Sequence, residues 1–302
     1  MPSVAVVSLP WAAVVTSSPL PSHPDRRLLL EKLFNFRDLG GYPTADGRQV
    51  RWRTLYRSDG FHRLGVDDLQ AVADLGLKTV LDLRTPREVE EWGRFPVEHI
   101  PVEFLHLPFM ETTWDPATIT AETVAHEFLA ARYLDMLETG AVAIARGLRT
   151  LADPVRCPAV FHCAVGKDRT GVMAAVVLAL LGVSDADIAD DYGLSAEAME
   201  RFTAWVKDTD PEAAESMARH AAFLSAPPEA VHGFLDGVRE RYDSIEGYVA
   251  SIGVDPAVVG RLRANLLAPP ISRRPGSPPT GAWPPGQRHT RPRLPAPRPA
   301  GR

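Results

Sequence analysis

A twelve-residue apolar stretch beginning at Gly171 constrains the fold of this chain more than any other feature. Residues 171–182 contain no charged side chain. A helix of this length is about 18 Å long, which is too short to cross a bilayer and suits burial between other elements. The residues just before it include a short apolar stretch, Ala159-Val160-Phe161-His162, and a loop of mixed composition joins the two. A buried strand, a loop and a buried helix in this order indicate an α/β fold.

The same order of elements occurs earlier in the chain. The segment 78–84 is a short, largely apolar strand that ends in charged residues. Thr85-Pro86-Arg87-Glu88 follows, with an N-cap residue, a proline at the first helical position and a glutamate at the third, which predicts the start of a helix. Further helices are predicted over 66–75, 121–152, 184–207, 211–224 and 229–241, and from Asp255 to near Leu267. We therefore expect a central, mostly parallel sheet flanked by helices, with functional groups at the carboxyl ends of its strands.

Composition divides the chain into an acidic body and a basic tail. Residues 269–302 contain eleven prolines, seven arginines and no acidic residue, a charge of +7, so that residues 1–268 carry −12 of the total of −5. An acidic body argues against a nucleic-acid binder, whose footprint would be a basic surface. We expect a flexible extension over 1–27, one domain over 28–268 and a disordered Pro/Arg-rich tail over 269–302, with no partner identified for the tail.

The sequence also bears on compartment and membranes. Two cysteines in 302 residues do not make a disulfide scaffold and fit a reducing compartment. No apolar run is long enough for a membrane-spanning helix, so we expect no integral membrane association. The apolar segment 3–15 lacks the basic residues that precede the core of a signal peptide. The prediction is a cytoplasmic protein, with a non-classical route of export left open.

The loop between the strand and the apolar helix carries the chemistry. Cys163 opens it and Arg169 closes it six residues later. Amides at a helix N-terminus attract anions, and those of Ala164, Val165, Gly166 and Lys167 can curl around one phosphate group, with glycine allowing the tight bend. Arg169 can hold the same phosphate with two N–H groups, and this positive environment favours a Cys163 thiolate, which is a nucleophile for phosphorus. His162 is expected to orient the loop from behind, and Thr170 to donate a hydrogen bond to the thiolate.

The segment 162–171 resembles the signature loop of the cysteine-based protein tyrosine phosphatases, in the version found in atypical bacterial members that act on tyrosine, serine and lipid phosphates. Asn35-Phe36-Arg37-Asp38, Leu55-Tyr56-Arg57-Ser58, Asp82-Leu83-Arg84 and the stretch 242–248 extend the likeness. The resemblance implies a tyrosine-phosphatase-like fold, a phosphocysteine intermediate, no metal or other cofactor, and a helical lid, here over about 190–228. It also implies a phosphorylated protein or a phosphoinositide as substrate, and Asp168 as the acid that protonates the leaving group.

Two other aspartates compete with Asp168 for the role of acid. Asp82 ends a strand at the expected functional edge, although the nearby Arg84 offers it a salt bridge instead. Asp115 lies in Trp114-Asp115-Pro116, similar to the mobile acid loop of other tyrosine phosphatases but in a different order. Asp-Pro is also a common start of a turn.

The remaining candidates are weaker. Lys167 is either a ligand for a second phosphate on an inositol ring or a solvated loop lysine. Arg37 and Asp38 either border the phosphate pocket or pair with each other. Cys157 begins the strand that Cys163 ends, too far away for a disulfide, and is expected to be a packing residue. The histidines show no metal-ligand spacing. The alternatives to a protein phosphatase are a phosphoinositide phosphatase and a catalytically silent phosphate-binding module.

Overall fold

The strand predicted at 159–162 lies in the middle of a five-stranded sheet. A computed structural model of the chain describes residues 26–113, 123–218 and 224–269. The sheet has the strand order β1-β3-β6-β4-β5, in which β3, β6, β4 and β5 run parallel and β1 is antiparallel to β3. A separate pair is formed by β2 and β7. The strands are β1 Arg37–Asp38, β2 Gln49–Val50, β3 Leu55–Ser58, β4 Thr79–Asp82, β5 Glu103–His106, β6 Ala159–His162 and β7 Leu267–Ala268.

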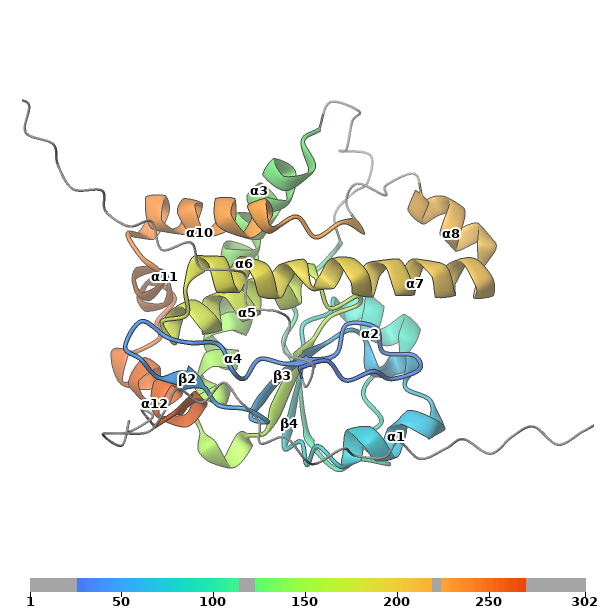
Figure 1. Cartoon of the computed structure of the whole chain (residues 1–302), viewed down its shortest axis with the longest axis horizontal. Helices are drawn as coiled ribbons and strands as arrows, with labels where there is room; N and C mark the ends of the chain where they lie inside the picture. Colours follow the sequence, from blue (N-terminus) through green and yellow to red (C-terminus); the bar gives the residue numbers. More distant parts are fainter. Residues whose placement is uncertain (1–25, 114–122, 219–223, 270–302) are drawn as a thin grey trace, which may run out of the picture. The chain divides into compact units, whose positions relative to one another are not determined.

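Helices cover both faces of this sheet, which confirms the predicted α/β class. In Figure 1, α1 and α2 lie on one side of the strands, and α4, α5, α11 and α12 lie on the other. The helices are α1 Val66–Ala73, α2 Pro86–Trp92, α3 Ala125–Thr139, α4 Ala141–Leu151, α5 Asp168–Leu180, α6 Asp185–Gly193, α7 Ser195–Thr209, α8 Pro211–Ala218, α10 Pro228–Tyr242, α11 Ile245–Ser251 and α12 Pro256–Leu266, with short 3-10 turns η1 Phe61–Arg63 and η3 Pro154–Arg156.

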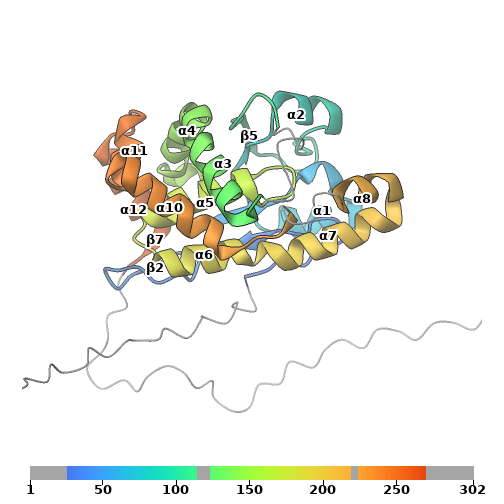
Figure 2. The same cartoon turned by 90° about the horizontal axis from the view of Figure 1, so that it is seen from above.

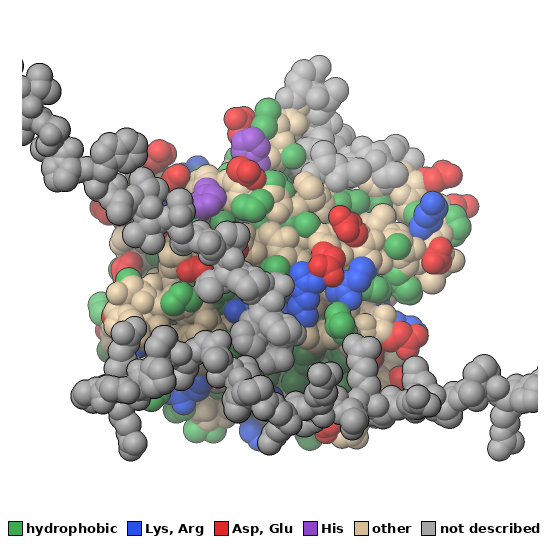
Figure 3. Space-filling model, viewed as in Figure 1, with side chains coloured by type: hydrophobic (Ala, Val, Ile, Leu, Met, Phe, Trp, Pro, Cys, Tyr) green, Lys and Arg blue, Asp and Glu red, His purple; other side chains and the backbone are tan. Residues whose placement is uncertain are grey.

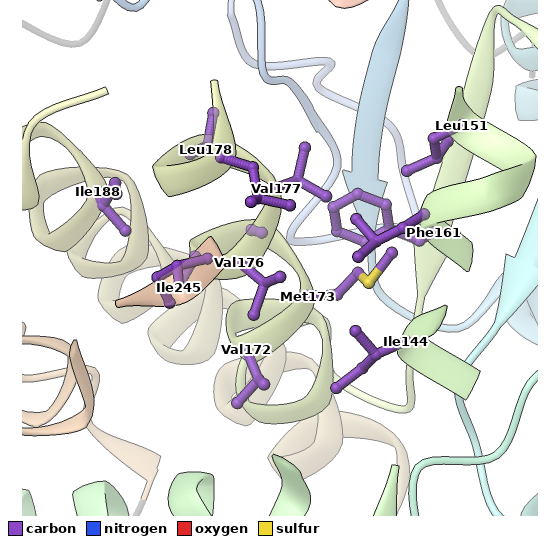
Figure 4. Packing of buried hydrophobic residues seen from close by; sticks show 14 of the residues in the cluster. Ile144, Leu151, Phe161, Val172, Met173, Val176, Val177, Leu178, Ile188 and Ile245 are labelled. Atoms are coloured by element: carbon purple, nitrogen blue, oxygen red, sulfur yellow. The ribbon is translucent and has the colours of Figure 1, made fainter. Parts of the chain in front are cut away.

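Two hydrophobic clusters reflect the two faces of the sheet. In β6, Phe161 belongs to the larger cluster, whereas Val160 belongs to the smaller cluster with α1 and the loops around it. Successive strand residues point to opposite faces, so a strand that is apolar at both positions is buried on both sides. Figure 4 shows Met173 of α5 pointing towards Phe161 and towards Ile144 of α4. This packing fixes the start of α5 against the carboxyl end of β6.

The apolar helix begins earlier than its composition indicates. It starts at Asp168 rather than at Gly171 and ends at Leu180. Polar residues of the first turn escape a search for apolar runs, yet an aspartate at a helix N-terminus is favoured by the helix dipole. The helical stretch predicted over 121–152 is also divided, because α3 ends at Thr139 and α4 begins at Ala141, with Gly140 as the cap between them. A Cβ at Gly140 would lie 2.7 Å from the carbonyl oxygen of Met136.

Residues just before the expected domain start at residue 28 contact the rest of the domain. Arg26 is buried, donates to the carbonyl oxygens of Asp38 and Gly40, and lies over the ring of Tyr42. At the other end, the chain divides into a unit of residues 1–270 and a second unit of 271–302. The predicted tail lies outside the described residues, apart from Pro269.

The segment predicted as a lid, 190–228, is mostly helical where it is described, and residues 225–227 lie outside any helix. It contains the end of α6, then α7 and α8, and Figure 2 shows α8 beside the end of α7. Phe202 and Trp205 of α7 pack against Phe34. The ring centroid of Phe34 lies 5.6 Å from that of Phe202 and 5.7 Å from that of Trp205. Acidic and basic side chains lie next to one another along α7 on the face shown in Figure 3, in keeping with the Arg27–Glu197 ion pair. No described helix is long and apolar enough to cross a membrane.

Candidate active site

The predicted loop leaves the carboxyl end of β6 and enters α5 at Asp168. Cys163 is 1% exposed at the bottom of this loop. Gly166 has φ +68°, and a Cβ there would lie 2.7 Å from the carbonyl oxygen of Ser58. Only glycine adopts this conformation and this close approach without strain. The sequence expectation for Gly166 is therefore matched by its geometry.

The carbonyl groups of the loop are all held from outside. Three consecutive carbonyl oxygens accept hydrogen bonds from the surrounding scaffold. The pairs are Gly60 N to Ala164 O at 3.1 Å, Asn35 Nδ2 to Val165 O at 3.0 Å and Arg57 Nη2 to Gly166 O at 2.8 Å. Within the described part of the chain, the amides of these three loop residues donate to no protein acceptor. Carbonyls fixed outward and amides left available are the arrangement of an anion-binding nest.

Arg169 is oriented by a carboxylate that the sequence interpretation treated only as a helix cap. Glu88 accepts from both Nη1 and Nη2 of Arg169, the latter at 2.8 Å. The same glutamate closes the predicted capping box with Thr85 at the start of α2. Burial alone would lower the pKa of Arg169, but Glu88 and the nearby Cys163 raise it above its ordinary value. Glu88 fixes one edge of the guanidinium, whose other N–H groups stay available for a phosphate.

Asp168 is the first residue of α5, and its side chain is 18% exposed. The hydroxyl of Tyr133 in α3 donates to Asp168 Oδ1 at 2.6 Å. The hydroxyl of Tyr192 in α6 lies 2.6 Å from that of Tyr133. Nothing in the sequence singled out either tyrosine, because each looked like an ordinary apolar residue of a helix.

Lys167 is not a solvated lysine. It is 2% exposed, donates from Nζ to the carbonyl oxygen of Ser225 at 2.9 Å, and lies 3.2 Å from Asp168 Oδ1. Ser225 follows α8 in the segment predicted as a lid. The lysine therefore links the loop to that segment, and in this arrangement its charge is partly taken up by Asp168.

A buried ionic cluster lies beneath the loop. Asp191 of α6 accepts from Arg37 at 3.0 Å and from Arg57 at 2.6 Å, and Tyr42 donates to the same carboxylate at 2.9 Å. Burial alone would raise the pKa of Asp191, but the two arginines hold it well below the ordinary value. Burial and the charge of Arg37 lower the pKa of Arg57 to about 10, so that it remains charged at neutral pH.

The sequence left open whether Arg37 and Asp38 border the phosphate pocket or pair with each other, and the structure shows neither arrangement. Arg37 lies in the cluster and supports the loop through Asp191, and it does not pair with Asp38. The carboxylate of Asp38 accepts from the backbone amides of Gly40 and Arg53, both at 2.7 Å, and so holds a turn. Neither side chain lines the pocket described below.

Asp82 is buried at the carboxyl end of β4. It is fully buried, and its Oδ1 accepts from Arg84 Nε at 2.9 Å while its Oδ2 lies 3.6 Å from His162 Nε2. Burial alone would raise the pKa of Asp82, but His162 and Arg84 outweigh burial and hold it at about 2. Burial lowers the pKa of His162. The Nδ1 atom of His162 lies 3.3 Å from the carbonyl oxygen of Cys163.

The structure places the other candidates as follows. Thr170 is fully buried, and its hydroxyl has no hydrogen-bond partner within the described residues, so the hydrogen bond predicted from Thr170 to Cys163 is not formed in this structure. Cys157 is half-buried and packs against the core, with its Sγ 3.3 Å from Asn265 Nδ2. Asp115 lies outside the described residues. Among the described residues, no group of three or more His, Cys, Asp or Glu side chains is arranged to hold a metal ion.

A pocket of about 90 Å³ opens beside the loop. It is lined by Asp168 and Arg169 from the start of α5 and by Met110, Thr113 and Met136. The two methionines give it an apolar wall next to the charged groups. The pocket thus brings the predicted acid and the predicted phosphate-binding arginine into one space.

Comparison with known proteins identifies the family of this chain. The sequence pattern of the tyrosine phosphatase family matches residues 28–268. A protein of Cupriavidus necator assigned as a tyrosine-protein phosphatase is 33% identical over 281 residues, covering 85% of this chain and 94% of that protein. The triple specificity protein phosphatase PtpB of Mycobacterium tuberculosis is 28% identical, covering 78% of this chain and 96% of that protein.

Among solved structures, the catalytic core of the PP-IP phosphatase SIW14 from S. cerevisiae aligns with 62% of this chain and 99% of its own. The identity is 17% and the TM-score is 0.32, too low to carry weight. The match of the family pattern over most of the chain is decisive, and it confirms the resemblance seen in the loop. This chain belongs to the tyrosine phosphatase family.

Proposed function

We propose that this phosphatase hydrolyses phosphotyrosine through a phosphocysteine intermediate on Cys163. The thiolate attacks phosphorus, an S–P bond forms, and the P–O bond to the leaving group breaks. Asp168 gives its proton to the departing oxygen. A water molecule then attacks phosphorus, Asp168 takes a proton from it, and the S–P bond breaks to release inorganic phosphate and the thiolate.

The observation that carries this proposal is the hydrogen bonding of the loop, whose carbonyl groups are bound by surrounding residues while its amides stay available. Because the scaffold binds the carbonyls from outside, the amides stay available for the oxygens of the transferring phosphoryl group, and no reorganisation is needed during the reaction. Arg169, fixed by Glu88, adds a charged donor on the same side. The mechanism has Cys163 ionised and Asp168 protonated. The four basic side chains of the ion pairs around the loop then exceed the negative charges there by one, which favours a dianionic substrate despite the acidic body.

The pocket supports an aryl phosphate as substrate. Met110 and Met136 line it next to Arg169, and methionine makes favourable contacts with aromatic rings. Activity on phosphoserine, phosphothreonine or phosphoinositides is the wider alternative, and the name of the mycobacterial relative, a triple specificity phosphatase, supports including these substrates in a test. The segment 190–228 is the proposed lid. The hydrogen bond from Lys167 in the loop to the carbonyl oxygen of Ser225 supports a link between this lid and the loop.

The test compares Cys163→Ser with Cys157→Ser, the other cysteine of the chain. We expect Cys163→Ser to abolish turnover of a phosphotyrosine peptide while retaining binding. Cys157→Ser should leave turnover within about twofold, because Cys157 precedes β6, packs against the core and lies at the opposite end of that strand from the loop. Rapid acid quenching with ³²P-labelled substrate should trap label on the wild type and not on Cys163→Ser. Side-by-side kinetics on phosphoserine and phosphoinositides define the substrate range. Turnover that survives in Cys163→Ser would refute the mechanism, and absence of turnover in wild type on all three substrates would favour a silent binding module.

A further inference from the structure

The general acid of the proposed mechanism is held by a pair of buried tyrosines. Tyr133 and Tyr192 are each 1% exposed. The Tyr133 hydroxyl has a single hydrogen, which it donates to Asp168 Oδ1 at 2.6 Å. The contact of 2.6 Å between the two hydroxyls therefore requires Tyr192 to donate to Tyr133. The result is a directed chain of two hydrogen bonds that ends on the carboxyl group of Asp168.

The packing around the pair fixes its geometry. The rings of Tyr133 and Tyr192 meet edge to face with centroids 6.0 Å apart, and Phe234 of α10 packs against Tyr133. A Cβ at Gly171 would lie 3.1 Å from the Tyr192 ring, so the glycine in the first turn of α5 allows that ring to approach. Three helices, α3, α5 and α6, thus meet at these two rings.

The two oxygens of Asp168 have different surroundings. Oδ1 accepts from Tyr133, and Lys167 Nζ lies 3.2 Å from the same oxygen. An oxygen already facing two donors is a poor site for a further proton, so the transferable proton belongs on Oδ2. Asp168 also lines the pocket, next to Arg169.

We propose that Tyr133 and Tyr192 are positioning residues for the general acid, which fix Asp168 through Oδ1 and leave Oδ2 to protonate the leaving group. This inference rests on the proposed function of Asp168. Burial raises the pKa of both tyrosines above the ordinary value, so both remain neutral donors at neutral pH. They act through Asp168, since neither of them lines the pocket.

The experiment compares two substrates that differ in their need for an acid. Phenyl phosphate has a poor leaving group that must be protonated, whereas dinitrophenyl phosphate has a good one that leaves without help. The quantity measured is kcat/KM, which reports the steps through loss of the leaving group. The variants are Tyr133→Phe, Tyr192→Phe and the double variant. The control is Tyr248→Phe, which removes an equally buried hydroxyl that donates to Leu137 O at 2.8 Å.

We expect Tyr133→Phe to lower kcat/KM for phenyl phosphate about tenfold and for dinitrophenyl phosphate less than about twofold, because a misplaced acid forfeits part of its contribution. Tyr192→Phe should show the same selectivity at about threefold. The double variant should match Tyr133→Phe alone, since Tyr192 acts only through Tyr133. Tyr248→Phe should affect both substrates equally.

Asp168→Asn distinguishes a failure of the proposed acid from a failure of the positioning role of the two tyrosines. If it fails to show a selective loss on phenyl phosphate, the proposed acid is wrong and the positioning role falls with it. If it shows the loss but Tyr133→Phe and Tyr192→Phe lower both substrates equally, the acid stands and the positioning role is refuted. Thermal unfolding of each variant, compared with that of Tyr248→Phe, separates both results from a general loss of folded protein.

Discussion

Asp82 and Asp168 occupy comparable places in the fold and have opposite surroundings. Asp82 ends β4, and Asp168 follows the loop that leaves the neighbouring strand β6. Asp82 is fully buried and engages Arg84 through both of its oxygens. Asp168 is 18% exposed and is held through one oxygen by a neutral hydroxyl and a lysine.

The difference shows how a protein chooses between equivalent carboxylates. A bidentate arginine uses both oxygens and stabilises the charged form, which removes the group from proton transfer. A hydroxyl and a lysine that share one oxygen fix the orientation of the carboxyl and leave its second oxygen for chemistry. The partner, and not the place at the sheet edge, therefore distinguishes the structural aspartate from the proposed acid.

The strongest test of this contrast is Asp168→Asn. We expect kcat/KM for phenyl phosphate to fall about 10²- to 10⁴-fold, the usual contribution of a general acid. The free energy of unfolding should change by less than about 1 kcal/mol, because the side chain is partly exposed and its amide oxygen can still accept from Tyr133. The measurements are steady-state kinetics against pH and urea unfolding. A near-wild-type rate with an unchanged pH profile would contradict the role of Asp168.

Asp82→Asn should give the reverse pattern. It leaves the buried Arg84 without a counter-charge, which destabilises the fold by about 3 kcal/mol. Turnover per folded molecule should stay within about threefold of wild type. The check is urea unfolding together with activity normalised to the folded fraction. A large loss of turnover at unchanged stability would reverse the assignment of the two aspartates.

The difference in the free energy of unfolding between wild type and Asp82→Asn should depend on pH. The pKa of Asp82 is about 2 in the folded protein, below its ordinary value of 3.8. A lowered pKa means that the stabilisation is fully present above the ordinary value and is lost as the pH falls towards 2. The gap in stability between wild type and Asp82→Asn should therefore narrow by about 1 kcal/mol at pH 3 and about 2 kcal/mol at pH 2. A gap that stays constant from pH 5 to pH 3 would show that the carboxylate is not stabilised by its partners.

The smallest expected effect belongs to Lys167, the charged partner on the Asp168 side. If the lysine leaves Ser225 to bind a second phosphate, Lys167→Ala should lower kcat/KM for a phosphoinositide about tenfold, since a hydrogen bond to a charged group is lost. Phosphotyrosine turnover should fall by about twofold. Equal losses on both substrates, measured side by side, would limit Lys167 to its structural contacts and remove the argument for a lipid substrate.

Local signals in the sequence predicted much of this arrangement. The apolar runs and the helix-start residues at Thr85 identified the α/β class and the strand–loop–helix unit, because burial and capping depend on neighbouring residues. The spacing of Cys163 and Arg169 and the glycine between them predicted a phosphate-binding loop, because loop geometry also depends on neighbouring residues.

Contacts over long sequence distances were not readable in this way. Glu88 was visible as the cap of α2, yet its pairing with Arg169 spans 81 residues. Asp191 and Tyr192 gave no signal, although one supports Arg57 and the other reaches Asp168 through Tyr133. The sequence by itself determined the fold class and the loop, since these follow from local periodicity and spacing. Only the tertiary structure decided which side chains hold the loop, its arginine and its aspartate, because hydrogen-bond partners are chosen by packing between distant helices.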